Sequence, residues 1–353
     1  MFNRLLRLAI LCAVSILSLL SCTTTNKTTN NTTNNGSGFQ GRGIELSADT
    51  KLRIVSYNGF FTSIFPNDKG EARTNEWIEK KNASSSERIN GFASWAPRAN
   101  ADIFALQETI YTKGSMADTT VEGITEYFNG VTGQKWYAAG DNQGRLILSR
   151  HPILWSSRVK NARGMAALID LPDEVSQDLL LINLHLLSSN AERRVWQARH
   201  AVRFIKGVRE GAYADIPKDA PVIICGDFNS EVNDLPHSIL TKLEEEPDKD
   251  DLNEAHYVNP EPRQLKSDSK GTFGSVVWEG EIGSSNYQLA VRSIDHMLIP
   301  KGYMTVSNAF VFNSLTLSRE DLKRYGVKRE DLLLVREGSE EKLDHLPVFI
   351  DLK

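Results

Sequence analysis

The chain has 353 residues and a formal net charge of -4, with 40% hydrophobic and 24% charged residues. This composition is ordinary for a soluble globular protein that buries a core. The slightly acidic balance excludes a protein that coats nucleic acid through a global basic field, although it leaves room for a local basic groove.

The N-terminus has the pattern of a bacterial export signal. Arg4 and Arg7 precede an apolar run over residues 8–20, which is shorter than the about 20 residues that span a bilayer. The run ends in Leu-Ser-Cys and resembles a lipobox, in which Cys22 is acylated. We therefore predict a lipoprotein signal peptide over 1–21 and lipidation of Cys22. A plain signal peptide cleaved elsewhere and an uncleaved anchor are the alternatives.

The tract TTTNKTTNNTTNNGSG follows Cys22 and contains no apolar side chain. Such a composition stays extended and solvated, so residues 22–47 are predicted to form a Thr/Asn-rich tether. We find no repeat and no second low-complexity linker further on, which predicts one domain over 48–353. The predicted location is the bacterial cell envelope, with a lipid anchor in the membrane.

Strands and helices alternate along this domain. Hydrophobic periodicity predicts strands over 52–57, 102–106, 136–139, 145–148, 153–159, 165–171, 179–186, 222–225, 294–299, 304–311 and 347–352, and helices over 87–95, 191–208 and 319–325. The closely spaced strands between 136 and 186 are typical of an antiparallel meander. The mixture predicts an α/β fold with two sheets packed face to face and helices outside.

Polar residues stand at the ends of several predicted strands, and each has an ordinary explanation when taken alone. Asn58 can be a turn residue, and Glu108 a solvated acid. His185 shares one face of a nearly apolar strand with Asn183, so both side chains must find hydrogen-bond partners there. A core histidine and a catalytic histidine both explain that pattern.

The segment GDFN also follows an apolar strand. Alternation places Asp227 and Asn229 on one side of the strand and turns Phe228 into the packing. In the Asp-His pairs at 295–296 and 344–345, alternation lets only one residue of each pair point toward a given site.

Together these strand ends supply carboxylates, imidazoles and carboxamides, which is the inventory of a hard-metal phosphoesterase. Mg²⁺ prefers oxygen ligands and is typically held by one or two carboxylates plus substrate phosphate. The sequence contains no CxxC, HExxH, GxSxG or GxxxxGK[ST] motif. Cys225 is the only cysteine after Cys22, and its apolar strand indicates a core residue rather than a nucleophile.

Six motifs carry a resemblance to the endonuclease/exonuclease/phosphatase superfamily. They are SYN at 56–58, LQE at 106–108, NLHL at 183–186, GDFN at 226–229, IDH at 294–296 and DHLPV at 344–348. The resemblance implies a four-layer α/β (α+β) sandwich with two packed, mainly antiparallel sheets flanked by helices. It also implies an Mg²⁺-dependent hydrolase of phosphate esters, with Mn²⁺ as a substitute. Leu343 stands where the last motif usually has Ser, and Tyr57 where Trp is frequent, which weakens any transfer of substrate.

The same resemblance implies roles for individual residues. The metal ligands would be Glu108, Asn58 and Asp344; the catalytic residues His345, Asp295, His185, Asp227 and Asn229; and the substrate contacts Asn229, His185 and Arg194. His345 would act as general base, with Asp295 accepting its ring N–H. His185 and Asn229 would donate hydrogen bonds to phosphoryl oxygens. Asp227 would orient the nucleophile or assist the leaving group, and His296 is turned away.

The substrate is predicted as nucleic acid, because it is the commonest substrate in the superfamily. The alternatives are a sphingomyelinase or another phospholipid head-group phosphodiesterase, and a small-molecule phosphatase. An inactive, surface-tethered binding protein is the alternative of another class, which the intact motifs disfavour. The Arg side chains of 191–208 are spread around the helix, which favours a solvated face over a phosphate-binding stripe. No protein partner is implied, and a monomer is expected.

Overall fold

The computed structural model describes residues 44–59, 64–71, 85–109, 120–141, 143–232, 234–246, 256–258, 263–264, 293–314, 317–332 and 345–353. All of them fall within the unit Gln40–Lys353. The predicted signal peptide, Cys22, Asp344 and most of the predicted tether lie outside the described residues. No helix in these ranges is both long enough and apolar enough to cross a membrane.

Two sheets form the centre of the fold. The seven-stranded sheet has the order β10 (Arg263–Gln264), β12 (Val306–Val311), β13 (Val348–Leu352), β1 (Leu52–Asn58), β2 (Ile103–Gln107), β4 (Leu146–Ser149) and β3 (Tyr137–Gly140). The six-stranded sheet has the order β5 (Ile153–Val159), β6 (Gly164–Ile169), β7 (Leu179–His185), β8 (Val222–Asp227), β11 (Asp295–Pro300) and β9 (Tyr257–Val258).

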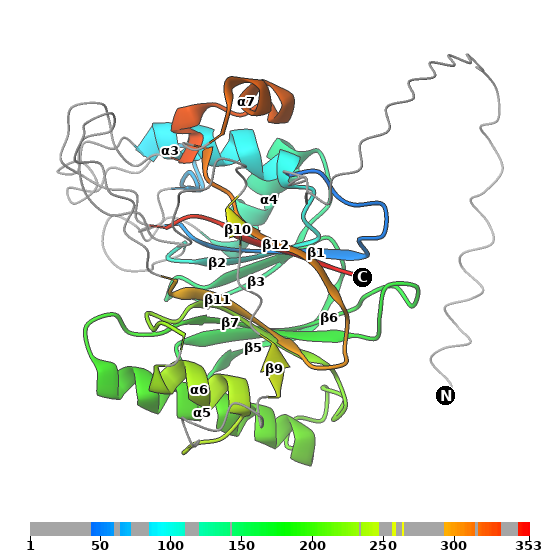
Figure 1. Cartoon of the computed structure of the whole chain (residues 1–353), viewed down its shortest axis with the longest axis vertical. Helices are drawn as coiled ribbons and strands as arrows, with labels where there is room; N and C mark the ends of the chain where they lie inside the picture. The colour runs from blue at the N-terminus through cyan, green and yellow to red at the C-terminus, as the bar shows by residue number, and fades with distance from the viewer. Residues whose placement is uncertain are drawn as a thin grey trace, which may run out of the picture. The chain divides into compact units, whose positions relative to one another are not determined.

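Helices cover the outer face of each sheet, as Figure 1 shows. The seven-stranded sheet carries α3 (Ser85–Trp95), α4 (Val121–Thr132) and α7 (Arg319–Tyr325), together with the short 3-10 helices Ala96–Ala99 and Arg329–Leu332. The six-stranded sheet carries α5 (Ala191–Glu210) and α6 (Leu235–Lys242). The predicted four-layer α/β sandwich is confirmed. Most pairs are antiparallel, and the parallel ones are β1–β2, β7–β8 and β10–β12.

The predicted single meander between 136 and 186 was wrong. β3 and β4 form an antiparallel pair in the seven-stranded sheet, whereas β5, β6 and β7 form an antiparallel run in the six-stranded sheet. The chain changes sheets at residues 150–152, where Pro152 cannot donate to a ladder. β4 of one sheet and β6 and β7 of the other are all short, mainly apolar runs, so the sequence pattern alone does not show the change.

Two hydrophobic cores hold the layers together. One includes the inner faces of both sheets and the side chains of α3 and α4, with Trp95, Phe104 and Phe128 fully buried in it. The other lies between the six-stranded sheet and its helices, and includes Val202 and Ile224. The sandwich is therefore packed on both faces of each sheet.

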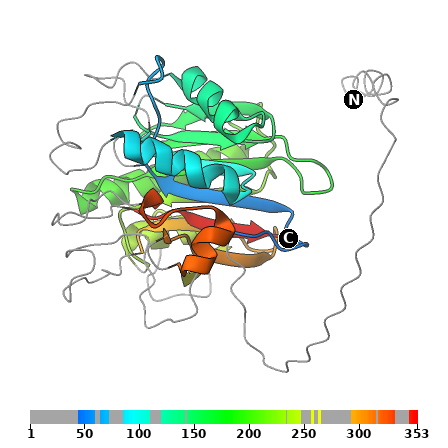
Figure 2. The same ribbon diagram turned by 90° about the horizontal axis from the view of Figure 1, so that it is seen from above.

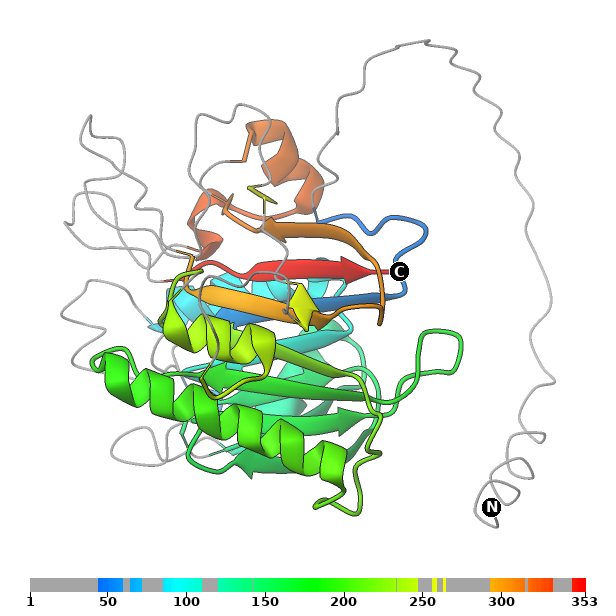
Figure 3. The same cartoon turned by 60° about the horizontal axis from the view of Figure 1, so that its bottom comes forward.

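Helix α5 lies beside α6 (Figure 3), and several of its basic side chains bind neighbouring elements. Arg203 Nε donates to Glu245 Oε2 at 2.9 Å, and Arg199 Nε donates to the Glu245 carbonyl at 2.9 Å. Arg209 Nη1 donates to the carbonyls of Lys218 and Ala220 at 2.5 and 2.7 Å. These cations hold the helix against the protein, which agrees with the expectation that they do not form a phosphate-binding stripe.

A fully buried ion pair joins β1 to β13, which lie side by side (Figure 2). Arg53 Nε and Nη2 donate to the two carboxylate oxygens of Asp351 at 2.5 and 2.8 Å. Arg53 Nη1 also donates to the carbonyls of Ile44 and Ala99. Both charges of the pair are compensated inside the protein. Removal of one partner would leave the other as a buried, uncompensated charge.

Substitution Arg53→Met is therefore expected to destabilise the protein by about 3 to 5 kcal/mol, because it leaves the Asp351 carboxylate buried and unpaired. Urea unfolding followed by tryptophan fluorescence measures the change. The double variant Arg53→Met, Asp351→Leu should recover part of the loss. An Arg53→Met protein within about 1 kcal/mol of the wild type would contradict the assignment, since that is the range of exposed pairs.

Candidate active site

Strand ends from both sheets meet at one edge of the sandwich. Asn58 ends β1 and Glu108 follows β2, which is parallel to β1. His185 ends β7 and Asp227 ends β8, which is parallel to β7. Asp295 begins β11 and pairs with Asp227 in the antiparallel register. The topology thus brings together residues that are far apart in the chain.

Asp227 lies at the centre of this edge. Asn58 Nδ2 donates to Asp227 Oδ2 at 3.1 Å and to Glu108 Oε1 at 3.3 Å. His185 Nε2 lies 3.5 Å from Glu108 Oε1 and 3.7 Å from Asp227 Oδ2. Each contact of Asp227 with Asn58, and of His185 with Glu108, crosses from one sheet to the other. The site is therefore shared between the two sheets.

His345 and Asp295 form a hydrogen-bonded pair beside Asp227. His345 Nδ1 lies 2.7 Å from Asp295 Oδ2, and both side chains are buried. A carboxylate can only accept, so Nδ1 carries the proton. His345 Nε2 then faces Asp227 Oδ2 across 3.6 Å. A base held by an acid in this tautomer can take a proton at Nε2.

Asn229 reaches Asp227 through a turn, so the prediction that strand alternation aligns the two side chains was wrong. β8 ends at Asp227, and Asn229 has a left-handed φ of 48°. Asn229 N–H donates to Asp227 Oδ1 at 2.8 Å, and its Nδ2 donates to Asp227 Oδ2 at 3.1 Å and to the Leu186 carbonyl at 2.8 Å. Asn tolerates this conformation and can form such a turn. Phe228 is fully buried, as predicted.

Glycine is required at the start of this turn. Gly226 has a φ of 127°, and a Cβ placed there would lie 2.0 Å from the carbonyl oxygen of Leu184 on β7. The close approach of the two backbones puts Asp227 level with His185. Glu108 also has a left-handed φ, of 56°. Non-glycine residues in this region are uncommon and cluster at functional sites.

The electrostatics of the edge follow from burial and neighbouring charges. Burial raises the pKa of Asp227, and the negative charges of Asp295 and Glu108 raise it further, while His345 opposes them. Burial lowers the pKa of His185 well below its usual value, and the positive charge of Arg163 adds to this effect. His185 is therefore neutral near pH 7 and can act as a hydrogen-bond donor without carrying charge.

Arg163 and Arg145 were not predicted from the sequence. The Arg163 carbonyl accepts from His185 N–H at 3.0 Å, and its half-buried guanidinium acts on the pKa of both His185 and Arg145. Arg145 is fully buried and forms an ion pair with Asp141. Arg163 occupies a turn between β5 and β6, and its nearness to the site depends on the pairing of β6 with β7, which the sequence pattern does not reveal.

The predicted substrate contact Arg194 lies in the first turns of α5. Its Nη1 donates to the carbonyls of Leu187 and Ser188 at 3.0 and 2.7 Å. These residues follow β7, so Arg194 supports the loop next to His185. Its contact with substrate stays a prediction.

His296 points to the opposite side of β11 from Asp295, as alternation predicted. Its Nε2 lies 2.7 Å from the Ser230 carbonyl, and its ring packs 5.1 Å from Phe228 and 4.9 Å from His237 between centroids. Burial, with a smaller contribution from His296, lowers the pKa of His237 to about 3. This imidazole pair therefore stays neutral and supports the GDFN turn from behind.

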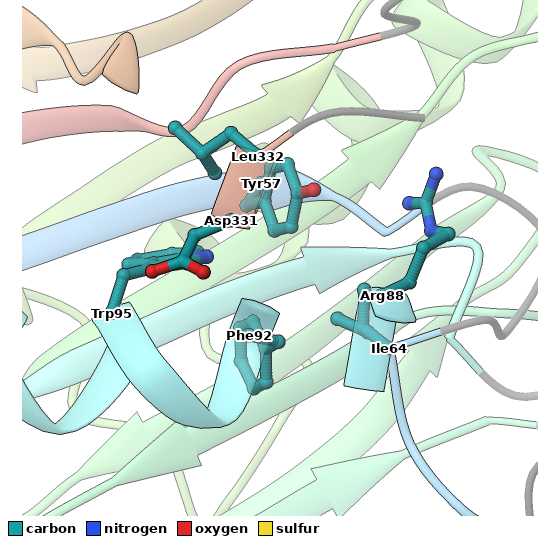
Figure 4. A pocket seen from close by; sticks show the side chains of 7 residues that line it. All are labelled: Tyr57, Ile64, Arg88, Phe92, Trp95, Asp331 and Leu332. Atoms are coloured by element: carbon teal, nitrogen blue, oxygen red, sulfur yellow. The ribbon is translucent and has the colours of Figure 1, made fainter. Parts of the chain in front are cut away.

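A separate hollow lies behind Asn58 and contains none of the carboxylates described above (Figure 4). It is lined by Tyr57, Ile64, Arg88, Phe92, Trp95, Asp331 and Leu332. Arg88 Nη2 donates to the carbonyl of Gly59 at 3.0 Å. Arg88 thus holds the backbone just after Asn58.

The sandwich and its edge of carboxylates and imidazoles define a phosphoesterase fold. The model of the endonuclease/exonuclease/phosphatase family matches residues 67–319, well over half of the chain. The chain belongs to this family of phosphoric ester hydrolases. The match includes neither Asn58 nor His345, which the structure brings to the same edge.

Solved structures agree on the fold. A mannosyl-6-phosphatase from Bacteroides thetaiotaomicron VPI-5482 has a TM-score of 0.52 at 15% identity, covering 86% of this chain and 99% of that chain. A Bacteroides thetaiotaomicron protein of the endonuclease/exonuclease/phosphatase family has a TM-score of 0.54 at 15% identity, with 85% and 94% covered. ANGEL2, a 2′,3′-cyclic phosphatase, has a TM-score of 0.51 at 14% identity, with 85% and 95% covered. No curated protein matches the sequence.

The buried His237 predicts a specific dependence of stability on pH. Its folded pKa of about 3 lies below the unfolded value, so the unfolded chain binds more protons below about pH 6.5 and stability falls as the pH falls. Between pH 7 and pH 5 this one group should remove about 2 kcal/mol. His237→Phe should lose less stability than the wild type over the same interval in urea unfolding. Identical losses in the two proteins would rule out a neutral, buried His237.

Proposed function

We propose that this chain is a divalent-metal-dependent phosphodiesterase that hydrolyses its substrate by attack of an activated water, with nucleic acid as the leading substrate. The row formed by Asp295, His345 and Asp227, opposite Glu108 of the other sheet, is the observation that carries the proposal. It supplies an oriented base and a carboxylate region within one buried edge, as water-attack hydrolysis needs.

The donor set fits a hard divalent cation. Asp227 is buried, and the negative charges of Asp295 and Glu108 oppose its ionisation. A cation would relieve that repulsion, and Mg²⁺ or Mn²⁺ prefers such oxygen donors. Asp227, Asp295 and His345 place potential ligand atoms within 4.8 Å of one another. Because Asp295 and His345 already bind each other at 2.7 Å, we assign the ion instead to Glu108, with Asn58 and Asp344 as further ligands.

A bound Mg²⁺ would stabilise negative charge on the phosphoryl group and on the leaving oxygen. His345 Nε2 takes the proton of the attacking water, and Asp295 holds the ring in the required tautomer and stabilises the imidazolium that forms. Asp227 Oδ2, 3.6 Å from Nε2, orients the water. The proton thus moves from water to Nε2 as the new bond to phosphorus forms and the bond from phosphorus to the leaving oxygen breaks. The leaving oxygen then takes a proton from solvent, and the His345 imidazolium returns its proton to solvent.

Neutral and cationic donors border the place where the phosphoryl oxygens would lie. His185 is held neutral and can donate from Nε2. Asn229 is fixed beside Asp227 by its turn, and its Nδ2 can exchange the bond to Asp227 Oδ2 for one to a phosphoryl oxygen. The charges of Arg163 and Arg145, close enough to lower the pKa of His185, favour an anionic group on that side. Hydrogen bonds to charged groups are the stronger ones, so His185 and Asn229 would supply phosphate affinity.

Nucleic acid stays the leading substrate because it is the commonest substrate in the family to which the chain belongs. A sphingomyelinase-type enzyme and a small-molecule phosphatase are the alternatives. An inactive binding protein would be expected to have lost at least one catalytic group. Asp227, His345 and His185 are all present and within contact distance, which does not support that alternative.

The first experiment tests metal and base together. The purified protein with Mg²⁺ or Mn²⁺ is offered plasmid DNA, single-stranded DNA, RNA, sphingomyelin and mannose 6-phosphate. We expect cleavage of nucleic acid, abolished by EDTA and restored by Mg²⁺. His345→Ala should lower kcat by about 10²- to 10⁴-fold, the usual share of a general base, and Glu108→Gln should weaken Mn²⁺ binding in calorimetry.

His256→Ala, at an exposed position distant in the sequence from every site residue, is the matched control and should retain activity. If only sphingomyelin or only mannose 6-phosphate is cleaved, the proposed nucleic-acid substrate is wrong, but the proposed metal-dependent mechanism still holds. Turnover that persists both in EDTA and in His345→Ala would refute the mechanism.

We also propose that the protein is a monomer held in the bacterial cell envelope by a lipid on Cys22, through the predicted tether. Mass spectrometry of the natively expressed protein should find a mature N-terminus at Cys22 with added acyl mass. Cys22→Ser should release the protein from the membrane fraction. An unmodified terminus at another residue would disprove the anchor.

A further inference from the structure

Two buried amide side chains connect the sheets directly beneath the site. Gln107 is the last residue of β2, and Asn183 lies in β7 of the other sheet; both are fully buried. Gln107 Nε2 donates to Asn183 Oδ1 at 2.7 Å. Asn183 Nδ2 donates to the carbonyls of Leu106 and Leu146 at 2.8 and 3.0 Å.

The carbonyls that Asn183 contacts belong to two neighbouring strands. Leu106 of β2 and Leu146 of β4 form the last register pair of those strands. One side chain of the six-stranded sheet therefore binds two strands of the seven-stranded sheet where their pairing ends. Gln107 also donates to Ser56 Oγ at 3.3 Å, which extends the contact to β1 within its own sheet.

Each amide stands next to a residue of the proposed site. Glu108 directly follows Gln107, and its carboxylate faces His185 of the other sheet at 3.5 Å. Asn183 precedes His185 by one alternation, so both point to the same face of β7. Asn183 is level with Cys225, and His185 is level with Asp227. Any shift of one sheet along the other would change the Glu108–His185 and Asn58–Asp227 distances together.

We propose that Gln107 and Asn183 are positioning residues that set the register between the two sheets and so hold Glu108 against His185 and Asp227. The inference rests on the proposed function. Apolar packing between sheets is non-directional and tolerates small slides. Hydrogen bonds are directional, and the bonds of 2.7 to 3.0 Å from Gln107 to Asn183 and from Asn183 to two backbone carbonyls do not tolerate such slides. Catalytic groups must be held to within about 0.5 Å, and the amide link supplies that precision.

The test compares Gln107→Met, Asn183→Leu and the double variant, in the full protein with Mn²⁺ and bis(4-nitrophenyl) phosphate as probe. Gln107→Met leaves Asn183 Oδ1 without its donor, and Asn183→Leu removes the donor of the Leu106 and Leu146 carbonyls, so the melting temperature should fall in both. The double change removes both amide groups and should restore part of the lost melting temperature. Replacing both partners of a hydrogen bond by apolar groups costs less than leaving one partner unsatisfied. Its kcat should nevertheless stay at least 10-fold below the wild type, with KM changed by less than about threefold.

Ser56→Ala is the matched control. It removes a bond that Gln107 makes within its own sheet and leaves the link between sheets intact, so kcat should stay within about twofold of the wild type. Mn²⁺ affinity, measured by calorimetry, gives a readout apart from turnover. It should weaken about 10-fold in the double variant, because Glu108 is displaced.

A double variant with wild-type kcat and wild-type Mn²⁺ affinity would overturn the proposal and leave the amides a stabilising role only. If the double variant does not fold, Gln107→Met is compared with the control Ser56→Ala instead. Wild-type kcat and wild-type Mn²⁺ affinity in Gln107→Met would then overturn the proposal. Failure of the proposed function would look different. In that case Glu108→Gln and His345→Ala would both remain active, whatever the amide variants do.

Discussion

The geometry of the candidate site depends on how the two sheets are placed against each other. Asn58 and Glu108 belong to one sheet, and His185 and Asp227 to the other, yet Asn58 Nδ2 lies 3.1 Å from Asp227 Oδ2 and Glu108 Oε1 lies 3.5 Å from His185 Nε2. A common apolar core packs the sheets together, but hydrophobic packing is non-directional. The fixed geometry comes from strand-end polar contacts, and the buried amides below them provide the directional part.

The second constraint is charge. Three carboxylates in a buried edge would destabilise the fold if all were ionised and uncompensated. Asp295 is compensated by His345, and Asp227 by hydrogen bonds from Asn58 and Asn229. The raised pKa of Asp227 shows that this compensation is incomplete. The cation that we propose at Glu108 would complete the compensation of these carboxylates.

Much of this could be predicted from the sequence where the signal was local. The predicted strands over 52–57 and 222–225 are those of β1 and β8, because long apolar runs dominate there. The helix α4 was missed, since two glycines in VEGITEYFNGVT lower its helix propensity. The cap of Thr120 on Gly123 N–H was the signal that could have found it.

What could not be predicted depends on pairing between distant strands. The placement of Arg163 follows from β6 lying against β7, and the meander was divided because its strands pair in different sheets. Asn229 was placed on the correct side for the wrong reason, since a left-handed turn rather than an extended strand aims it at Asp227. Motif order identified the family, but only the fold shows how the motifs contact one another.

The central claim is that both sheets contribute to one cation site. The most direct measurement is anomalous diffraction from crystals soaked in Mn²⁺. The account predicts a single strong peak bonded to the Glu108 carboxylate, in the space that also borders Asn58 and Asp227, and loss of that peak in Glu108→Gln. A strong peak remote from Glu108, or the same peak in Glu108→Gln, would contradict it.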